Sequence, residues 1–206
     1  PASDTASSGL NGRLQRIARR ITSLIALVPA ALSASGNFKV AIQEITSVVY
    51  AAAVSLTRTA DANAYTANDV IGAAPGSTAA LEFANIGPSA GGDVILKSTT
   101  FMREEAALIS GEANYRLHLY NVTPPSALGD NVAWDLPAGD RDSYLGYIEL
   151  GTPVDIGSTL WVENNSINKQ VTLLSSSLFG YLVTIGAYTP TSAAVQRIVL
   201  HSTRIP

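Results

Sequence analysis

The chain has 206 residues, enough for one sizeable β-domain with an appendage and too few for two ordinary domains with separate cores. Its 47% of apolar residues exclude a disordered chain, and its 14% of charged residues with a net charge of −3 favour a subunit that hides surface against neighbours. The absence of cysteine excludes disulfides, thiolate metal sites and cysteine nucleophiles.

The N-terminal segment, residues 1–47, is basic and has a helical period. Residues 1–40 hold five basic side chains and one acidic one, a net charge of +4, so the rest of the chain carries −7. Apolar residues recur at alternating spacings of four and three, which predicts a helix over residues 9–28. This apolar stripe consists of Leu10, Leu14, Ile17, Ile21, Leu24 and Val28. Ser7 or Ser8 can cap the helix start, and Pro29 should end it.

The stripe and the arginines beside it are the predicted interaction site. Read as heptads, the stripe fills both core positions of a coiled coil with a Leu, Ile and Val mixture that tolerates three strands. No acidic residue faces Arg13 or Arg20, so docking on another protein surface is an open alternative. The basic members of the site are Arg13, Arg16, Arg19 and Arg20.

Three other interpretations of this segment are less favoured. A secretory signal would use Arg19-Arg20, the apolar run 21–32 and the small residues 31–34 as a cleavage site. A transmembrane helix needs roughly 20 apolar residues, more than this run offers. Nucleic-acid binding would need interleaved aromatic residues or a reading motif among the arginines. We therefore expect the basic face to meet acidic protein, and expect neither nucleic acid nor membrane as a partner.

From residue 48 onward the apolar period changes to two, and turn residues separate short runs. This pattern predicts an all-β fold, an antiparallel β-sandwich of jelly-roll type with eight or nine strands, over residues 48–206. The predicted strands are 54–59, 79–85, 93–102, 115–122, 144–150, 159–163, 169–174, 178–185 and 194–202. Residues 33–53 read as a link between arm and sandwich, with 41–49 able to form an edge strand or a short helix. Residues 104–109 read as a helical turn.

Side-chain alternation orients two of these strands. Tyr115, Leu117 and Leu119 should face one side, and Arg116, His118 and Tyr120 the other. In the last strand, Gln196, Ile198 and Leu200 should oppose Val195, Arg197, Val199 and His201.

Few residues have the types and spacings that catalysis needs. His118 and His201 lie in separate predicted strands without an acidic residue at metal-ligand spacing. No phosphate loop, nucleophile elbow or HExxH helix occurs. We expect no enzyme activity, no cofactor, and neither catalytic nor metal-ligating residues.

Two further groups of residues have a functional and a structural interpretation. Asp130, Asp135, Asp140 and Asp142 could offer oxygens to calcium, but their spacing does not match an EF-hand, and turn capping is favoured. Trp134, Trp161 and several tyrosines could stack on sugars, although in a sandwich aromatic residues are more often core.

Five short blocks resemble segments of virion proteins of tailed bacteriophages. They are Arg58-Thr59-Ala60-Asp61 running to Tyr65, Asp69-Val70-Ile71-Gly72, residues 115–121 (YRLHLYN), residues 130–134 (DNVAW) and Tyr144-Leu145-Gly146-Tyr147. They span about residues 54–150, and the arm lies outside the match. The virion proteins that these blocks resemble are similar to capsid cement, or decoration, proteins with a jelly-roll domain. This resemblance implies a homotrimer that clamps neighbouring major capsid protein subunits from the exterior of the capsid.

The leading expectation is a cement protein of a tailed-phage head that bridges major capsid subunits. Its arm would pack on a neighbour while its arginines meet acidic shell surface. The alternative is a fibre or tail component with a receptor- or glycan-binding sandwich as its head and the arm as its attachment.

Overall fold

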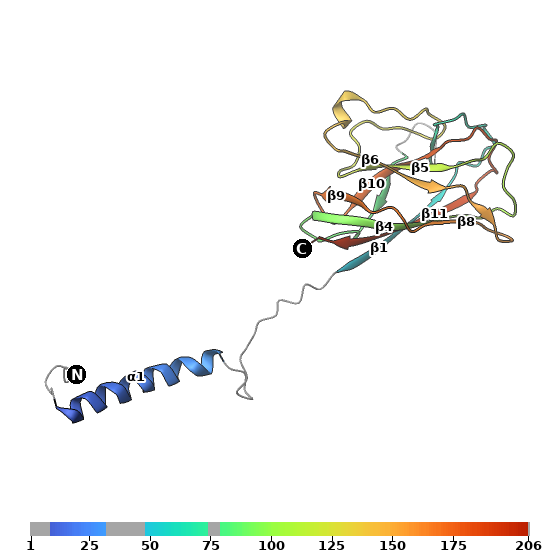
Figure 1. Ribbon diagram of the computed structural model, residues 1–206. Coiled ribbons are helices and arrows are strands. Elements are labelled where there is room, and N and C mark those ends of the chain that lie inside the picture. Colours follow the sequence, from blue (N-terminus) through green and yellow to red (C-terminus); the bar gives the residue numbers. More distant parts are fainter. Residues whose placement is uncertain (1–8, 32–47, 74–78, 206) are drawn as a thin grey trace. The chain divides into compact units, whose positions relative to one another are not determined.

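The computed structural model describes residues 9–31, 48–73 and 79–205, and for residues 24–31 it describes the helix course without the side chains. The chain divides into two units, residues 1–45 and 46–206, and each is described here by itself. Figure 1 shows the helix of the first unit and the strands of the second.

Helix α1 (Leu10–Ala31) is the described part of the first unit, and it confirms the predicted helix. It begins where the amides of Gly12 and Arg13 bond to the carbonyl oxygen of Gly9, at 3.1 and 3.2 Å. The predicted caps, residues 7 and 8, lie outside the described residues. The expectation that Pro29 ends the helix was wrong: proline lacks its own N–H, but the helical course continues to Ala31.

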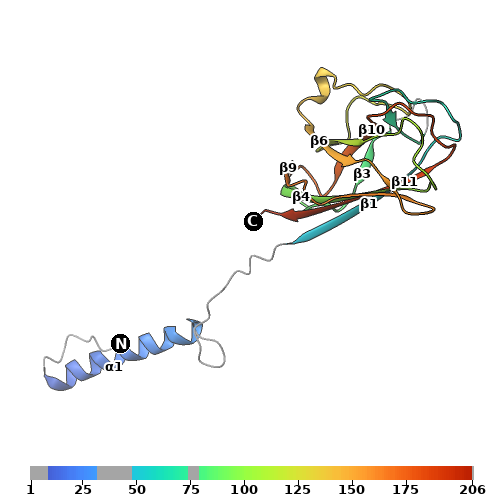
Figure 2. The ribbon, with the colours of Figure 1, turned by 45° about the vertical axis from the view of Figure 1, so that its right-hand side comes forward.

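The second unit, called the body, is a sandwich of two antiparallel sheets (Figures 1 and 2). The strands of sheet one are β1 (Val49–Thr57), β4 (Gly92–Arg103), β7 (Val154–Asp155), β8 (Leu160–Asn164), β9 (Lys169–Leu173) and β11 (Val195–Arg204). Their order is β1-β11-β4-β8-β7, and β9 also pairs with β4. The strands of sheet two are β2 (Val70–Ile71), β3 (Leu81–Phe83), β5 (Tyr115–Tyr120), β6 (Tyr144–Gly151) and β10 (Leu178–Thr184). Their order is β2-β10-β5-β6, and β3 also pairs with β10.

The strand order identifies the sandwich as a jelly roll. β8 pairs with residues 99–103 of β4 and β9 with residues 92–96, so the two share one edge of β4 and act as one interrupted strand. β2 and β3 share one edge of β10 in the same way. Apart from the two-residue edge strand β7, the eight strands that result, numbered along the chain, give the orders 1-8-3-6 and 2-7-4-5 in the two sheets. Two intertwined Greek keys produce this order, and the predicted fold is confirmed.

Each of the nine predicted strands corresponds to a strand of the structure, with some differences at the boundaries. β1 begins at Val49 and not at residue 54, so part of the segment assigned to a link belongs to the sandwich. The alanines of β1 have low strand propensity. Pairing of the whole strand with β11 overrides this low propensity. Residues 104–109, predicted as a helical turn, are irregular. The two-residue strands β2 and β7 were not predicted.

The main core lies between the two sheets and follows the predicted alternation. Tyr115, Leu117 and Leu119 of β5 are fully buried in it. Ile198 and Leu200 of β11 also lie in it, while their neighbours on the other face are at least partly exposed. Apolar side chains at every second position thus fix which face of each strand turns inward.

A second, smaller core lies on the outer face of sheet two, beneath the connection of residues 121–143 (Figure 1). Its buried members are Val70, Ala79, Tyr120, Tyr181 and Val183, and Leu128, Trp134 and Leu136 of the connection pack against them. The connection contains a short 3-10 helix, η1 (Ala138–Asp140). Sheet two is therefore covered on both faces.

Carboxylates hold this connection in place. Asp140 accepts hydrogen bonds from the amide and hydroxyl of Ser126, the latter at 2.9 Å. Asp130 accepts one from the amide of Gly72 at 2.8 Å, and Asp135 one from the amide of Leu136 at 2.8 Å. Asp135 bonds a neighbouring amide, as the turn-capping interpretation predicted, whereas Asp130 and Asp140 bond amides 58 and 14 residues away and tie separate segments together.

Candidate functional site

The arm presents an exposed apolar stripe. The exposed fractions of Leu10, Leu14, Ile17 and Ile21 are 74, 54, 54 and 50%. These residues recur at helical spacing and therefore lie on one face of α1. Leu24 and Val28 continue the same stripe in sequence, but their side chains lie outside the described residues. The structure thus places the described apolar residues of the predicted site on one face of α1.

The arginines lie on one side of this stripe. Arg13 and Arg20 each precede a stripe residue and flank it, and Arg16 and Arg19 lie further round the helix, all four exposed. The opposite flank carries the neutral residues Asn11 and Ala18. No acidic side chain occurs within Leu10–Ala31. The helix therefore has an apolar face with a basic margin on one side and a neutral margin on the other.

This asymmetry restricts how the helix can associate with copies of itself. In a parallel bundle the basic margin of one helix meets the neutral margin of the next, so no like charges oppose each other. In an antiparallel pair, like margins meet, and Arg13 and Arg20 of one helix would oppose the arginines of the other. The charge pattern thus permits parallel self-association and disfavours the antiparallel form.

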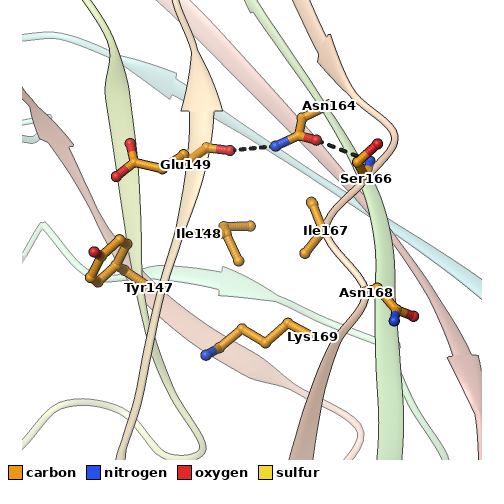
Figure 3. Close-up of a pocket in the computed structure, with 8 residues that line it drawn as sticks. All are labelled: Tyr147, Ile148, Glu149, Asn164, Ser166, Ile167, Asn168 and Lys169. Carbon is orange, nitrogen blue, oxygen red and sulfur yellow. Dashed lines mark hydrogen bonds between the residues drawn. The ribbon is translucent and has the colours of Figure 1, made fainter.

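A pocket of about 450 Å³ lies in the body, where an edge of each sheet meets the other (Figure 3). One wall is β6, and the other is the end of β8 with the segment leading to β9. Its lining residues are Tyr147, Ile148, Glu149, Asn164, Ser166, Ile167, Asn168 and Lys169. Sequence reasoning missed this pocket, because its walls come together only through the pairing of two different sheets.

The side chain of Asn164 connects the two walls of this pocket. The side-chain amide of Asn164 donates to the carbonyl oxygen of Glu149 at 2.8 Å, and its oxygen accepts from the amide of Ser166 at 3.0 Å (Figure 3). Ile148 and Ile167 point toward each other between the walls (Figure 3). The pocket therefore has an apolar middle, and Asn164 acts as a bridge from sheet one to sheet two.

The acid at the pocket rim is already paired. Glu149 accepts hydrogen bonds from Arg116 at 2.9 and 2.6 Å and from the side-chain amide of Asn114 at 2.5 Å. The same Arg116 guanidinium lies 4.1 Å from the ring centre of Tyr147. Tyr147 is 46% exposed, so part of its side chain is accessible to a ligand. The rim offers one aromatic face and the Lys169 ammonium, without a second carboxylate for acid–base catalysis.

Two buried arginines organise the loops around the body. Arg103 has no exposed side-chain surface and pairs with Glu112 and, at 2.7 Å, with Glu105. The hydroxyl of Tyr115 donates to Glu112 at 2.6 Å. Burial raises the pKa of Tyr115, which keeps this phenol protonated as a donor. The cluster is closed and structural, because each charge in it has a partner.

Arg58 forms the second of these clusters, within one of the blocks that resemble phage virion proteins. It donates to the hydroxyl of Tyr65 at 2.5 Å and to Asp61 at 3.2 Å. Tyr65 in turn donates to Asp130 at 2.6 Å. Burial, followed by the bond to Asp130, raises the pKa of Tyr65. The resemblance at this block thus falls on residues that hold loops together.

His118 is buried and makes its contacts with aromatic side chains. Its ring stacks on Trp134 with 3.6 Å between centroids, and Nδ1 lies 2.9 Å from the hydroxyl of Tyr144. Burial, assisted by the nearby Arg116 charge, lowers the pKa of His118 to about 3. The ring is therefore neutral at physiological pH. The predicted core role of Trp134 is confirmed by the same stacking and by its place in the second core.

Within the described parts of the chain, no three His, Asp or Glu side chains are placed to hold a metal ion. In those same residues, no helix combines the length and apolar character needed to span a bilayer.

No protein-family profile matches the sequence, and no curated protein is significantly similar to it. Among solved structures, a chain of tomato aspermy virus is 9% identical, with a TM-score of 0.28, over 91% of this chain and 96% of that one. A chain of the Kashmir bee virus virion at neutral pH is 15% identical, with a TM-score of 0.27, over 76% and 70%. CBM35 from Paenibacillus barcinonensis is 16% identical, with a TM-score of 0.26, over 72% and 95%.

Proposed function

We propose that this chain is a non-enzymatic structural subunit of a virus particle, a cement protein on the exterior of a tailed-phage head. Its partners would be the major capsid protein and two further copies of itself. The observation that supports this proposal most strongly is the exposed stripe of α1. Its apolar side chains are open to solvent and available to a partner. The jelly-roll body supports the proposal because this fold is used in viral capsid and lectin domains.

The stripe offers enough apolar surface to anchor a subunit. Full burial of one Leu or Ile side chain is worth about 1.5–3 kcal/mol. The four described stripe residues are 50–74% exposed. Covering them would contribute about 5 kcal/mol per arm before the entropic cost of association. Several arms that bind together would multiply this effect, as expected for a protein that holds a shell together.

The charge asymmetry of α1 favours a parallel trimer of arms, or an arm that lies along a capsid surface. In the trimer, the two core positions hold a mixture of Leu, Ile and Val that tolerates three strands. In the docked form, Arg13 and Arg20 require acidic residues on one side of the groove that receives the stripe.

The test compares two double variants with the same change in charge. Ile17→Asp with Ile21→Asp places two charges on the stripe, whereas Gln15→Asp with Thr22→Asp places them on an exposed face away from it. We expect the first pair to abolish retention on particles and to remove the association through the arms from the light-scattering mass of the isolated chain. The second pair should leave both unchanged. Full occupancy of particles by the stripe variant would refute the role of the arm.

A second candidate function is glycan binding by the body, with the arm as its attachment to a fibre or tail. The half-exposed ring of Tyr147 beside the open pocket favours it, because sugars stack on aromatic faces. A glycan array probed with the full chain, alongside Tyr147→Ala, tests it. Signal that disappears in the variant supports the candidate, and an array without signal rejects it.

A further inference from the structure

Within the described ranges, one edge of sheet one has no partner strand. β1 pairs with β11 on one side, through an uninterrupted register from Val49↔Thr203 to Thr57↔Val195. Among the strands that the structure describes, none pairs with its other side. β1 is nine residues long, whereas the edge strand at the far side of the sheet, β7, has two. The edge of sheet one formed by β1 is therefore longer than the opposite edge formed by β7.

The hydrogen bonds show which residues of β1 turn their backbone N–H and C=O groups away from β11; these are called the outward residues. The amide of Arg204 bonds to the carbonyl of Val48 and the amide of Arg58 to that of Ala194, so even-numbered residues of this strand bond toward β11. In an antiparallel ladder the residues between them turn their N–H and C=O groups to the opposite side. The outward residues are Val49, Ala51, Ala53, Ser55 and Thr57, and each is exposed.

This edge lacks the features that normally prevent strand addition. Natural proteins protect such edges with lysine, proline, bulges or very short strands. The sequence of β1, VYAAAVSLT, contains no charged residue and no proline, and its register with β11 shows no bulge. The outward residues are small, apart from Val49, so a second backbone can approach closely.

We propose that the free edge of β1 pairs with β1 of a second copy of the chain, antiparallel and on a two-fold axis at Ala53. Outward residues then oppose outward residues, Val49 with Thr57, Ala51 with Ser55 and Ala53 with itself. Up to about ten backbone hydrogen bonds form in this register. Sheet one continues from one body into the next.

The sequence of β1 is complementary to itself in this register, which is why a second copy is the occupant. On the outer face, small neutral side chains meet without clash or like-charge contact. On the inner face, the partner covers the half-buried Tyr50 and Val54, which meet Leu56 and Ala52 of the other copy. Arg197, which pairs with Ser55, and Arg197 of the other copy are separated by at least three strand spacings, about 14 Å, beyond the screening length.

This contact does not depend on the proposed function of the arm. A two-fold edge contact joins bodies in pairs, whereas a bundle of three arms joins chains around a three-fold axis. In an assembly that uses both, the edge links neighbouring trimers.

Cysteine cross-linking of the full chain tests the register, because the natural sequence has no cysteine. Ala53→Cys places two cysteines in one hydrogen-bonded pair, with Cα atoms about 5.5 Å apart, within disulfide range. Ala51→Cys is the matched control: it is the same residue type with the same exposure, but its copies lie about 14 Å apart. We expect at least about tenfold more disulfide dimer from Ala53→Cys, since Cα atoms beyond about 7 Å are not bridged.

Two further variants complete the test. A mixture of Ala51→Cys and Ser55→Cys chains should yield the mixed dimer. Ala53→Lys, which opposes two like charges on the axis, should weaken self-association roughly fivefold or more, and Ala51→Lys should weaken it less. Equal cross-linking by both cysteine variants, no cross-linking by Ala53→Cys, or loss of its cross-linking in the Ile17→Asp, Ile21→Asp background would each overturn the proposal.

Discussion

Replacing Arg103 by methionine tests whether the buried charge cluster holds the body together. The substitution keeps the length of the aliphatic stem and removes the guanidinium that pairs with Glu105 and Glu112. The side chains of these acids are 5 and 0% exposed, so two carboxylates would stay buried without their cation. Breaking a buried pair in this way costs about 3–5 kcal/mol. With a urea m-value of about 2 kcal/mol/M, the unfolding midpoint should fall by about 2 M.

The assay is urea unfolding of the full chain, followed by far-UV circular dichroism. Arg116→Met is the matched control, because it breaks the partly exposed pair with Glu149 and should cost only about 1 kcal/mol. Adding Glu105→Gln and Glu112→Gln to Arg103→Met should restore more than half of the loss, since no charge then remains buried. If Arg103→Met costs no more than Arg116→Met, the acids reach water or take up protons, and the reasoning is wrong.

Two other predictions concern His118 and the glycines. The pKa of His118 falls to about 3 in the folded state, so the unfolded state binds one more proton between about pH 6.5 and 3. His118 therefore removes about 1.4 kcal/mol of stability per pH unit as the pH falls through this window, and urea titrations of His118→Phe should lack this slope relative to the natural chain. Gly180→Ala should destabilise the body by about 1–3 kcal/mol, because its Cβ would lie 2.7 Å from the carbonyl oxygen of His118. Gly139→Ala, whose Cβ meets nothing within 4 Å, should leave the thermal midpoint unchanged, and an equal effect of both would contradict the packing argument.

The strands could be predicted because a two-residue period survives wherever one face is buried. β11 shows this most clearly, with Ile198 and Leu200 turned inward as expected. The start of β1 could not, because three consecutive alanines carry no alternation and only the pairing partner assigns them to a sheet.

The candidate sites were predictable to different degrees. The stripe of α1 follows from spacing alone, since helix geometry places Leu14, Ile17 and Ile21 on one face. The pocket and the Arg103 cluster join residues from separate elements, so no local pattern encodes them. The free edge depends on strand order, and that order depends on how all the strands pair.

The connection of residues 121–143 covers the outer face of sheet two, so the two outer faces of the body differ. β10 and β5 are buried on both faces, whereas β11 alternates buried and more exposed side chains. Among the described residues, the outer face of sheet one is thus the sheet face that remains more exposed to solvent. A partner protein that packs against an outer sheet face has the outer face of sheet one available. It would therefore bind every copy of the body in the same orientation. Tags or inserted domains placed in residues 121–143 would disturb a folded layer but leave that contact side clear.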